Sequence, residues 1–481
     1  MTFIADFADD ALRLVEDTTK RAGSLFEPSL RIGVTGLNRA GKTVFITSLV
    51  ANLLERERMT RLSAQRDGRI EATMLRPQPS ADVPRFDYEA HLAAMTGPNP
   101  VWPSSTRRTS ELRLSIRYRR TGLLAGLAGD GVLHLDIVDY PGEWLLDLPL
   151  LNTKWEDWAR QSIEAARRPE RIEHAGAFLA WAERVDGTAP LDEATAREGA
   201  ALFAEYLKAA RAAGLSAISP GRFLMPGDLA GTPALTFAPL PEPDGPHGSL
   251  ARLMRERYEA YRRVVVKPFF HSHFAKVDRQ IVLVDALSAI DAGPQAVADL
   301  RKAMSDILDC FRHGEKSWLG PIFGRRVDRL LFAATKADHV HHTQHGALQS
   351  ITTALVRESI ERAAYKGARV EALALASLRA TVEQDVQEGG ETLHCVRGRS
   401  IGTGEEVVVF PGQLPEDATS IVDASRRPGE YEEGASGQEW LSDDYGFMRF
   451  APPTRSGKPG YGPPHLRLDM AAEFLFGDKL A

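Results

Sequence analysis

The stretch Gly36-Leu37-Asn38-Arg39-Ala40-Gly41-Lys42-Thr43 follows the pattern G-x-x-x-x-G-K-[ST]. A short β-rich run, residues 30–34, comes immediately before it, and apolar residues at helical spacing follow over residues 44–54. A strand, a glycine-containing loop and a helix, in this order, form the arrangement in which such a motif surrounds phosphates. The sequence therefore predicts that a nucleotide binds to this loop.

Each residue type in this loop has a physical reason to be there. Gly36 and Gly41 have no Cβ atom, so the backbone can curl and bring its N–H groups close to a polyphosphate. The helix that follows adds unpaired N–H groups and the positive end of its dipole. Lys42 supplies a positive charge to the β- and γ-phosphates, and the Thr43 hydroxyl supplies a ligand for Mg²⁺. The residues predicted to contact the nucleotide here are Asn38, Arg39, Ala40, Gly41, Lys42, Thr43 and Val44.

The composition of the chain excludes several classes of protein. The formal net charge of the 481 residues is -6, which gives no general attraction for nucleic acid, so we expect no nucleic-acid partner. The two cysteines, Cys310 and Cys395, offer no disulfide framework and no zinc spacing. The N-terminus has no basic head before an apolar block, and no apolar run reaches the roughly 18 residues that span a membrane. We therefore expect a cytoplasmic protein without a transmembrane segment.

The pattern of apolar residues predicts an α/β fold. Residues 111–118 and 133–138 are strand-like and are expected to pair as a hairpin. Continuous apolar runs at 280–287, 329–334 and 370–376 are typical of buried parallel strands. We predict a P-loop NTPase domain with a mostly parallel sheet, one antiparallel strand and helices on both faces, interrupted by a large helical insertion and followed by an irregular C-terminal extension.

We expect six parts along the chain. They are an N-terminal amphipathic helix (1–28), the first part of the nucleotide-binding domain (29–150), a helical insertion (151–279), the second part of the nucleotide-binding domain (280–384), an irregular extension (385–465) and a C-terminal helix (466–481). Within the first part, residues 59–110 are polar, contain proline dipeptides and are expected to form a long loop. Within the extension, residues 406–410 alone resemble a strand.

The segment Asp139-Tyr140-Pro141-Gly142 follows the strand 133–138 directly. An aspartate at the carboxyl end of a strand, facing a phosphate loop, is placed where Mg²⁺ would sit. The backbone N–H of Gly142 can donate to the γ-phosphate, so that this loop would respond to the presence of that phosphate. We therefore predict that Asp139 is a metal ligand and that Gly142 takes part in catalysis together with Lys42.

The base of the nucleotide is predicted from Thr335-Lys336-Ala337-Asp338, which follows the strand 329–334. An ionised Asp338 can accept two hydrogen bonds side by side from guanine N1–H and N2–H₂, whereas adenine would leave the carboxylate unpaired. The stem of Lys336 can cover one face of the base, and Ser377 and Leu378 are expected to close the other side. The sequence therefore favours GTP over ATP.

Two further groups of residues are interpreted as surface features. His339, His341, His342 and His345 follow the base loop without a carboxylate of clear geometry, so we read them as polar surface rather than as a metal site. Arg325 and Arg326 precede the strand 329–334, at the far edge from its carboxyl end, so we expect solvated or paired side chains rather than an arginine finger.

The motifs GLNRAGKT, DYPGEW, TKAD and ASLRAT, in this order, resemble those of Ras-like P-loop GTPases. More narrowly, nearly the whole chain resembles the YcjX-like family of bacterial stress-associated GTP-binding proteins. The matching stretches are Thr35–Thr43, Trp102–Thr106, Asp139–Trp144, Lys267–Phe270, Asp278–Gln280 and Phe332–His339. The resemblance implies a cytoplasmic switch that binds GTP and GDP with Mg²⁺, hydrolyses GTP and takes part in a stress-related process. It also implies an unknown protein partner, with peripheral attachment to the inner membrane through that partner.

The resemblance also implies that Thr106 coordinates Mg²⁺ and senses the γ-phosphate. Thr109 remains the alternative, because a sequence does not set the register of a loop.

Glu143 follows Gly142 at a position where many Ras-like GTPases have the glutamine that orients the attacking water. A carboxylate can accept a hydrogen bond from water but cannot donate one to the γ-phosphate, and its charge opposes that of the phosphate. We therefore predict slow intrinsic hydrolysis, with the role of Glu143 open. Two alternatives stay open as well: a nucleotide-binding scaffold with incidental hydrolysis, and an ATP-using P-loop enzyme.

Overall fold

A computed structural model of the chain describes residues 27–37, 39–104, 106, 108–121, 129–272, 276–309, 327–365, 367–427, 448–454 and 460–481. Nearly all of the predicted N-terminal helix lies outside the described residues, as do Asn38, Cys310, Arg325 and Arg326.

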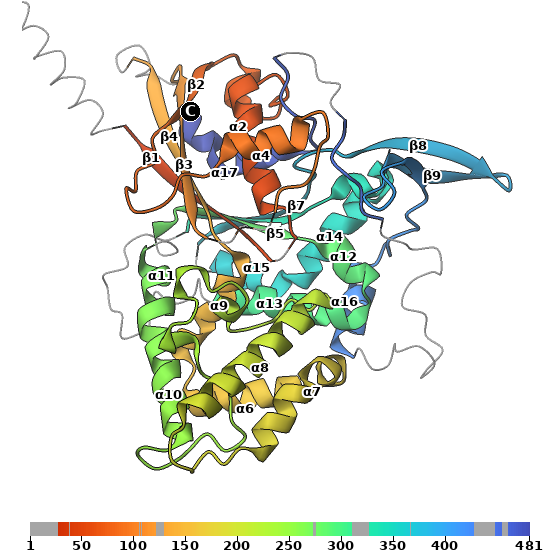
Figure 1. The fold of residues 1–481 in the computed structure, drawn as a ribbon. Helices are drawn as coiled ribbons and strands as arrows, with labels where there is room; N and C mark the ends of the chain where they lie inside the picture. The colour runs from red at the N-terminus through yellow and green to blue at the C-terminus, as the bar shows by residue number, and fades with distance from the viewer. Residues whose placement is uncertain are drawn as a thin grey trace, which may run out of the picture.

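A seven-stranded sheet with the order β2-β3-β4-β1-β5-β6-β7 forms the centre of the molecule (Figure 1). The strands are β1 (Ser29–Gly36), β2 (Ile70–Arg76), β3 (Ser110–Tyr118), β4 (Gly131–Asp139), β5 (Arg279–Val284), β6 (Arg329–Ala334) and β7 (Arg369–Ala374). Pairing is parallel from β4 through β1, β5 and β6 to β7. Only β3 in this sheet runs against its neighbours, β2 and β4. The predicted fold class is confirmed.

Alternate residues of the central strands enter two separate cores. In β5, Ile281 and Leu283 face one core, whereas Val282 and Val284 face the other. Helices α2 (Lys42–Glu55) and α17 (Leu468–Phe476) cover the first face. Helices α12 (Ala286–Asp291), α13 (Pro294–Asp309) and α14 (His345–Leu355) cover the second, and α15 (Arg357–Tyr365) follows α14. Because both faces are covered, these strands read as nearly continuous apolar runs.

The region 59–110 contains more regular structure than its sequence predicts. It holds α3 (Ser63–Arg66), the strand β2 and helix α4 (Tyr88–Thr96), so the expectation of one long loop is wrong. β2 pairs with β3 alone and is buried at Ile70 but exposed or half-buried elsewhere. An edge strand that buries so little shows no clear apolar alternation, so the sequence alone did not predict this strand.

The helical segment lies between β4 and β5 and packs on the second face of the sheet (Figure 1). The segment η1 (Gly142–Asn152) leads from β4 into the helical segment. The elements of the helical segment are α6 (Trp155–Ala166), α7 (Pro169–Arg184), α8 (Glu193–Ala212), α9 (Gly221–Leu224), η2 (Gly227–Leu229), η3 (Pro233–Leu235), α10 (Leu250–Tyr261), the π-helical turn η4 (Arg262–Val266) and α11 (Lys267–Ser272). Trp158 stacks on Tyr258 at 4.9 Å between ring centroids. A buried ion pair of 2.7 Å joins Arg171 on α7 to Asp299 on α13. Among the described helices, none is long and apolar enough to cross a membrane.

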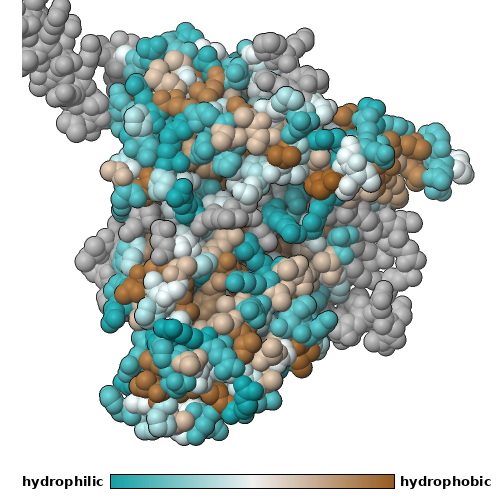
Figure 2. Space-filling view, viewed as in Figure 1, coloured by the Kyte–Doolittle hydropathy of each residue, from teal (hydrophilic) through white to brown (hydrophobic). Residues whose placement is uncertain are grey.

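The C-terminal extension is more ordered than the sequence predicts. It contains a three-stranded antiparallel sheet, made of β8 (Thr381–Glu388), β9 (Glu391–Arg399) and β10 (Glu406–Val409), and helix α16 (Ala418–Arg426). The β8–β9 hairpin projects from the body of the molecule, and hydrophobic patches lie on it (Figures 1 and 2). Because β8 is exposed on much of both faces, its sequence carries no buried stripe that would reveal it. After α17, η11 (Gly477–Leu480) ends the described chain.

Candidate functional site

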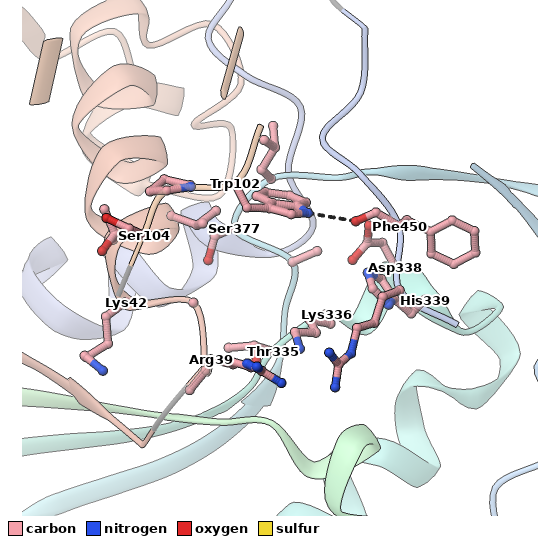
Figure 3. Close-up of a pocket in the computed structure, with 18 of the residues that line it drawn as sticks. Arg39, Lys42, Trp102, Ser104, Thr335, Lys336, Asp338, His339, Ser377 and Phe450 are labelled. Carbon is pink, nitrogen blue, oxygen red and sulfur yellow. Dashed lines mark hydrogen bonds between the residues drawn. The ribbon is translucent and has the colours of Figure 1, made fainter. Parts of the chain in front are cut away.

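A cavity of about 380 Å³ lies at the carboxyl edge of the sheet, between the loops that follow β1, β6 and β7 (Figure 3). Most residues that the sequence assigns to the nucleotide line this cavity: Arg39, Ala40, Gly41, Lys42, Thr43, Val44, Thr106, Glu143, Lys336, Asp338, Ser377 and Leu378. Asp139 contacts the lining residue Thr106, and Gly142 lies against Gly36 at the start of the phosphate loop. Segments that are 340 residues apart in the chain thus meet in one pocket.

The conformation of the phosphate loop is held by residues within the loop itself. Gly41 has a φ of 84°, in the region that favours glycine, and directly precedes α2. Lys42 is buried, and its Nζ donates to the carbonyl oxygen of Gly36 at 2.7 Å. No described side chain caps the first turn of α2, and that turn holds no acidic residue. Its N–H groups therefore remain available to an anion.

Three oxygen-bearing side chains meet beside this loop. Thr106 Oγ1 donates to Asp139 Oδ2 at 2.9 Å and lies 3.3 Å from Thr43 Oγ1. The second oxygen of Asp139, Oδ1, is buried without a hydrogen-bond partner among the described residues. Burial raises the pKa of Asp139 to about 6, although the charge of Lys42 and the hydrogen bond from Thr106 oppose the rise. Hydroxyl and carboxylate oxygens are the ligands that Mg²⁺ prefers, so this set fits the ion.

Thr109, the alternative to Thr106, is also buried, but its hydroxyl has no partner among the described residues. Only Thr106 of the two contacts Thr43 and Asp139.

The base end of the cavity is formed by the loops after β6 and β7. Lys336 adopts a left-handed conformation (φ 61°) before the short helix η8 (Ala337–His339), and its ammonium pairs with Asp285. Asp338 is buried, and its Oδ2 accepts a hydrogen bond from the Ala380 N–H at 2.7 Å. A carboxylate offers about four acceptor positions, so this bond orients Asp338 and leaves it able to accept others.

The C-terminal extension forms one wall of the cavity, which sequence reasoning did not find. Ile401, Arg449 and Phe450 line it. The indole N–H of Trp102 donates to the Phe450 carbonyl at 2.7 Å (Figure 3), and His339 packs edge-on against the Phe450 ring at 5.1 Å. Trp102 belongs to the stretch Trp102–Thr106 that resembles the family, and this resemblance was the sequence signal that could have placed it in the site. Phe450 is a single aromatic residue in a segment without periodicity and gave none.

The segment that begins at Gly142 is held by the helical segment. Glu143 is buried and forms an ion pair with Arg211 of α8. The guanidinium of Arg222 stacks over the Trp144 ring, 3.2 Å from its centroid. Sequence reasoning missed Arg211, because one arginine on an amphipathic helix carries no signal of its own.

Asp147, also in η1, is buried and binds four groups of the helical segment, one of which is the Arg222 N–H at 3.3 Å. It accepts hydrogen bonds from the Gly221 N–H at 2.6 Å and the Tyr261 hydroxyl at 2.5 Å, and lies within hydrogen-bond distance of the Ser219 hydroxyl. Burial raises its pKa to about 6 despite these bonds.

The histidines after the base loop correct the sequence analysis. His339, His341 and His345 are buried, and only His342 of the four is exposed, so the reading as polar surface is wrong for three of them. His345 Nε2 lies 2.7 Å from the Ala337 carbonyl and thereby supports the base loop. The strand β8, which the sequence did not predict, provides Glu383 as a partner for His341 and His342.

Comparisons with known proteins agree with this geometry. The YcjX-like family, DUF463, matches residues 30–480. A protein of Escherichia coli (strain K12) named "Ras-like GTPase YcjX" is 38% identical over 465 residues, which cover 94% of this chain and 96% of the relative. A Shewanella oneidensis protein of the same name is 35% identical over 477 residues, covering 94% of each chain. The chain therefore belongs to the YcjX-like family.

Proposed function

We propose that this protein binds GTP and GDP with Mg²⁺, hydrolyses GTP slowly and acts as a nucleotide-controlled switch. One observation carries the proposal: a single cavity joins the phosphate loop at Lys42 and Thr43 to the carboxylate of Asp338. The phosphate loop would bind any nucleoside triphosphate, whereas Asp338 would select guanine. Both relatives are named as Ras-like GTPases, which supports the same assignment.

In this proposal Thr43, Thr106 and Asp139 hold Mg²⁺. The unpartnered Oδ1 of Asp139 supports this role, because a buried carboxylate oxygen without a hydrogen bond is unfavourable until a ligand occupies it. The ion would neutralise charge on the β- and γ-phosphates. Lys42 would leave the Gly36 carbonyl to bind those phosphates, and Gly142 would offer its N–H to the γ-phosphate.

Slow hydrolysis is supported by the surroundings of Glu143. Its carboxylate pairs with Arg211. A carboxylate engaged in this way is a poor substitute for a glutamine that positions water, because it cannot donate to the γ-phosphate. The same pair favours the second candidate function, a nucleotide-binding scaffold in which hydrolysis is incidental.

The switch itself would use two loops. The loop 100–106 reaches the C-terminal extension through Trp102, and the segment 142–152 reaches the helical segment through Glu143 and Asp147. A γ-phosphate that engaged Thr106 and Gly142 would act on both loops at once. The proposal also places the protein in the cytoplasm, in the stress-related process that the family resemblance implies, with a protein partner at the inner membrane.

The experiment tests whether a substitution at Asp338 changes the base preference from guanine to xanthine. In Asp338→Asn the amide can donate to the 2-oxo group of xanthine and still accept from the Ala380 N–H. We expect wild-type protein to prefer GTP over ATP and XTP, and the variant to lose GTP affinity by about 100-fold or more while gaining XTP affinity. Isothermal titration calorimetry with the three nucleotides measures this.

The matched control is Asp244→Asn, at an exposed position of the helical segment, which should leave all three affinities unchanged. A wild-type preference for ATP, together with an Asp338→Asn variant that behaves like wild type, would overturn guanine selection and favour an ATP-using enzyme.

A further inference from the structure

Three histidines and two carboxylates gather where the base loop meets the β8–β9 hairpin. His341 and His342 lie at the helical turn η9 (His342–Gln344), Glu383 and Asp385 lie on β8, and His394 lies on β9. Glu383 and Asp385 are two residues apart and therefore share one face of the strand. His394 stands directly opposite Asp385 in the antiparallel register, so it joins the same face.

The ligand-type atoms of these residues converge on His341. His341 Nε2 lies 3.8 Å from Asp385 Oδ1 and 3.8 Å from Glu383 Oε2. His394 Nδ1 is 2.9 Å from Asp385 Oδ1, and the His341 and His394 rings lie nearly parallel with centroids 4.5 Å apart. In His341, Asp385 and His394, one ligand atom from each lies within 4.8 Å of the others. Tetrahedral Zn²⁺ holds its nitrogen and oxygen ligands about 3.4 Å from one another. The His341–Asp385 distance would therefore have to shorten, and the His394–Asp385 distance to lengthen, each by roughly half an ångström.

The ring of His341 is buried and its orientation is fixed by neighbouring groups. The His341 side chain is only 6% exposed. Its Nδ1 lies 3.0 Å from Thr343 Oγ1 and accepts a long hydrogen bond of 3.5 Å from the Thr343 N–H, which holds the ring with Nε2 towards the carboxylates. Metal binding at Nε2 would place the ring proton on Nδ1, where Thr343 Oγ1 can accept it.

We propose that His341, Asp385 and His394 bind one divalent transition-metal ion, with Zn²⁺ as the best match. Two imidazoles and a carboxylate are a donor set that suits Zn²⁺ and leaves a fourth position open. Glu383 and His342, which pair at 2.9 Å, flank the site on the other side of His341. The site is separate from the Mg²⁺ ligands of the nucleotide cavity and uses none of them.

The position of the ion would give it a structural effect. The start of the hairpin already contacts the base loop, because the Ala380 N–H and the Thr381 hydroxyl both donate to Asp338. His341 lies three residues after Asp338, and the other two ligands lie further along the hairpin. A bound ion would therefore fasten β8 and β9 to the base loop at a second point.

The test measures metal binding by the full chain without nucleotide. After treatment with a chelator, the protein is titrated with Zn²⁺ by isothermal titration calorimetry and with Co²⁺ by visible absorption. We expect one equivalent of Zn²⁺ per chain, a tetrahedral Co²⁺ spectrum and release of protons. Asp385→Asn and His394→Ala should each weaken binding by about 10- to 100-fold or more.

Both substituted side chains are substantially exposed (55% and 42%), so these variants should keep the fold, and thermal unfolding without metal checks this. His247→Ala, at an exposed position in the helical segment, is the matched control and should bind Zn²⁺ like wild type. A wild-type chain that binds no Zn²⁺, or Asp385→Asn and His394→Ala variants that bind it as tightly as wild type, would overturn the site.

Discussion

The phosphate loop and the segment 142–152 border the same site but are held in different ways. The phosphate loop keeps its shape through its own glycines and the bond from Lys42 to Gly36. The segment 142–152 depends on Arg211, Gly221 and Tyr261, which lie 68 to 114 positions from their partners in that segment. The phosphate loop is therefore preformed for binding phosphate. The position of the segment 142–152, in contrast, is coupled to that of the helical segment.

The largest effect is expected where the two regions touch. A Cβ atom at Gly142 would lie 1.9 Å from the carbonyl oxygen of Gly36, so Gly142→Ala must push the regions apart. We expect GTP affinity to fall by about 100-fold or more, or roughly 2.7 kcal/mol, as measured by calorimetry. Gly176→Ala on α7, where a new Cβ meets nothing within 4 Å, is the control and should bind GTP normally. Normal affinity in Gly142→Ala would show that the regions are independent.

A smaller effect on GTP affinity is expected when the segment 142–152 alone is released. Arg211→Ala leaves the buried Glu143 carboxylate without its partner, which should reduce the free energy of unfolding by about 3 kcal/mol. GTP affinity should fall far less than in Gly142→Ala, because the phosphate loop does not contact Arg211. Urea denaturation and calorimetry measure the two quantities.

Arg197→Ala on the same helix is the matched control for Arg211→Ala. Arg197 forms an exposed pair with Glu193, so its loss should change stability by at most about 0.5 kcal/mol. Equal effects of the two substitutions would mean that Glu143 does not depend on Arg211.

The smallest effect concerns pH. Because the folded-state pKa of Asp147 is about 6 and the unfolded value is about 3.9, its proton stabilises the fold below pH 3.9, and this stabilisation is lost as pH rises through 6. Asp147→Asn removes the titration. We therefore expect the variant to lose about 1 kcal/mol more stability relative to wild type at pH 5 than at pH 8. Urea denaturation at both values tests this, and a pH-independent difference would contradict it.

Sequence reasoning reached the features that are written in consecutive residues. Gly36–Thr43, Asp139–Gly142 and Thr335–Asp338 each follow a buried strand, and parallel strands bring their carboxyl ends to one edge of the sheet. The family and the fold class followed from the same motifs and are confirmed. The register of the loop that contains Thr106 could not be predicted from the sequence. The contacts of Thr106 with Thr43 and Asp139 are seen only in the structure.

The missed features depend on contacts between distant residues. Arg211 meets Glu143 across 68 positions, and Trp102 meets Phe450 across 348. Neither pair has a local pattern, because each partner is an ordinary residue in its own segment. The histidines were misread for the same reason, because their partners come from other segments: the carboxylates beside His341 and His342 lie on β8, whose exposed strand pattern is weak.

The position of α17 bears on how the protein is made. This helix, at residues 468–476, contributes Leu468, Leu475 and Phe476 to the core that β1, β4 and α2 share. A ribosome produces every nucleotide motif long before it reaches this helix. This face of the sheet, although α2 covers part of it, therefore stays incompletely covered while the roughly 90 residues between β7 and α17 are translated, and the exposed apolar surface is of the kind that aggregates or recruits chaperones. Full cover of this face of the nucleotide-binding sheet is thus a late event, set by the synthesis of α17 rather than by the appearance of the nucleotide motifs.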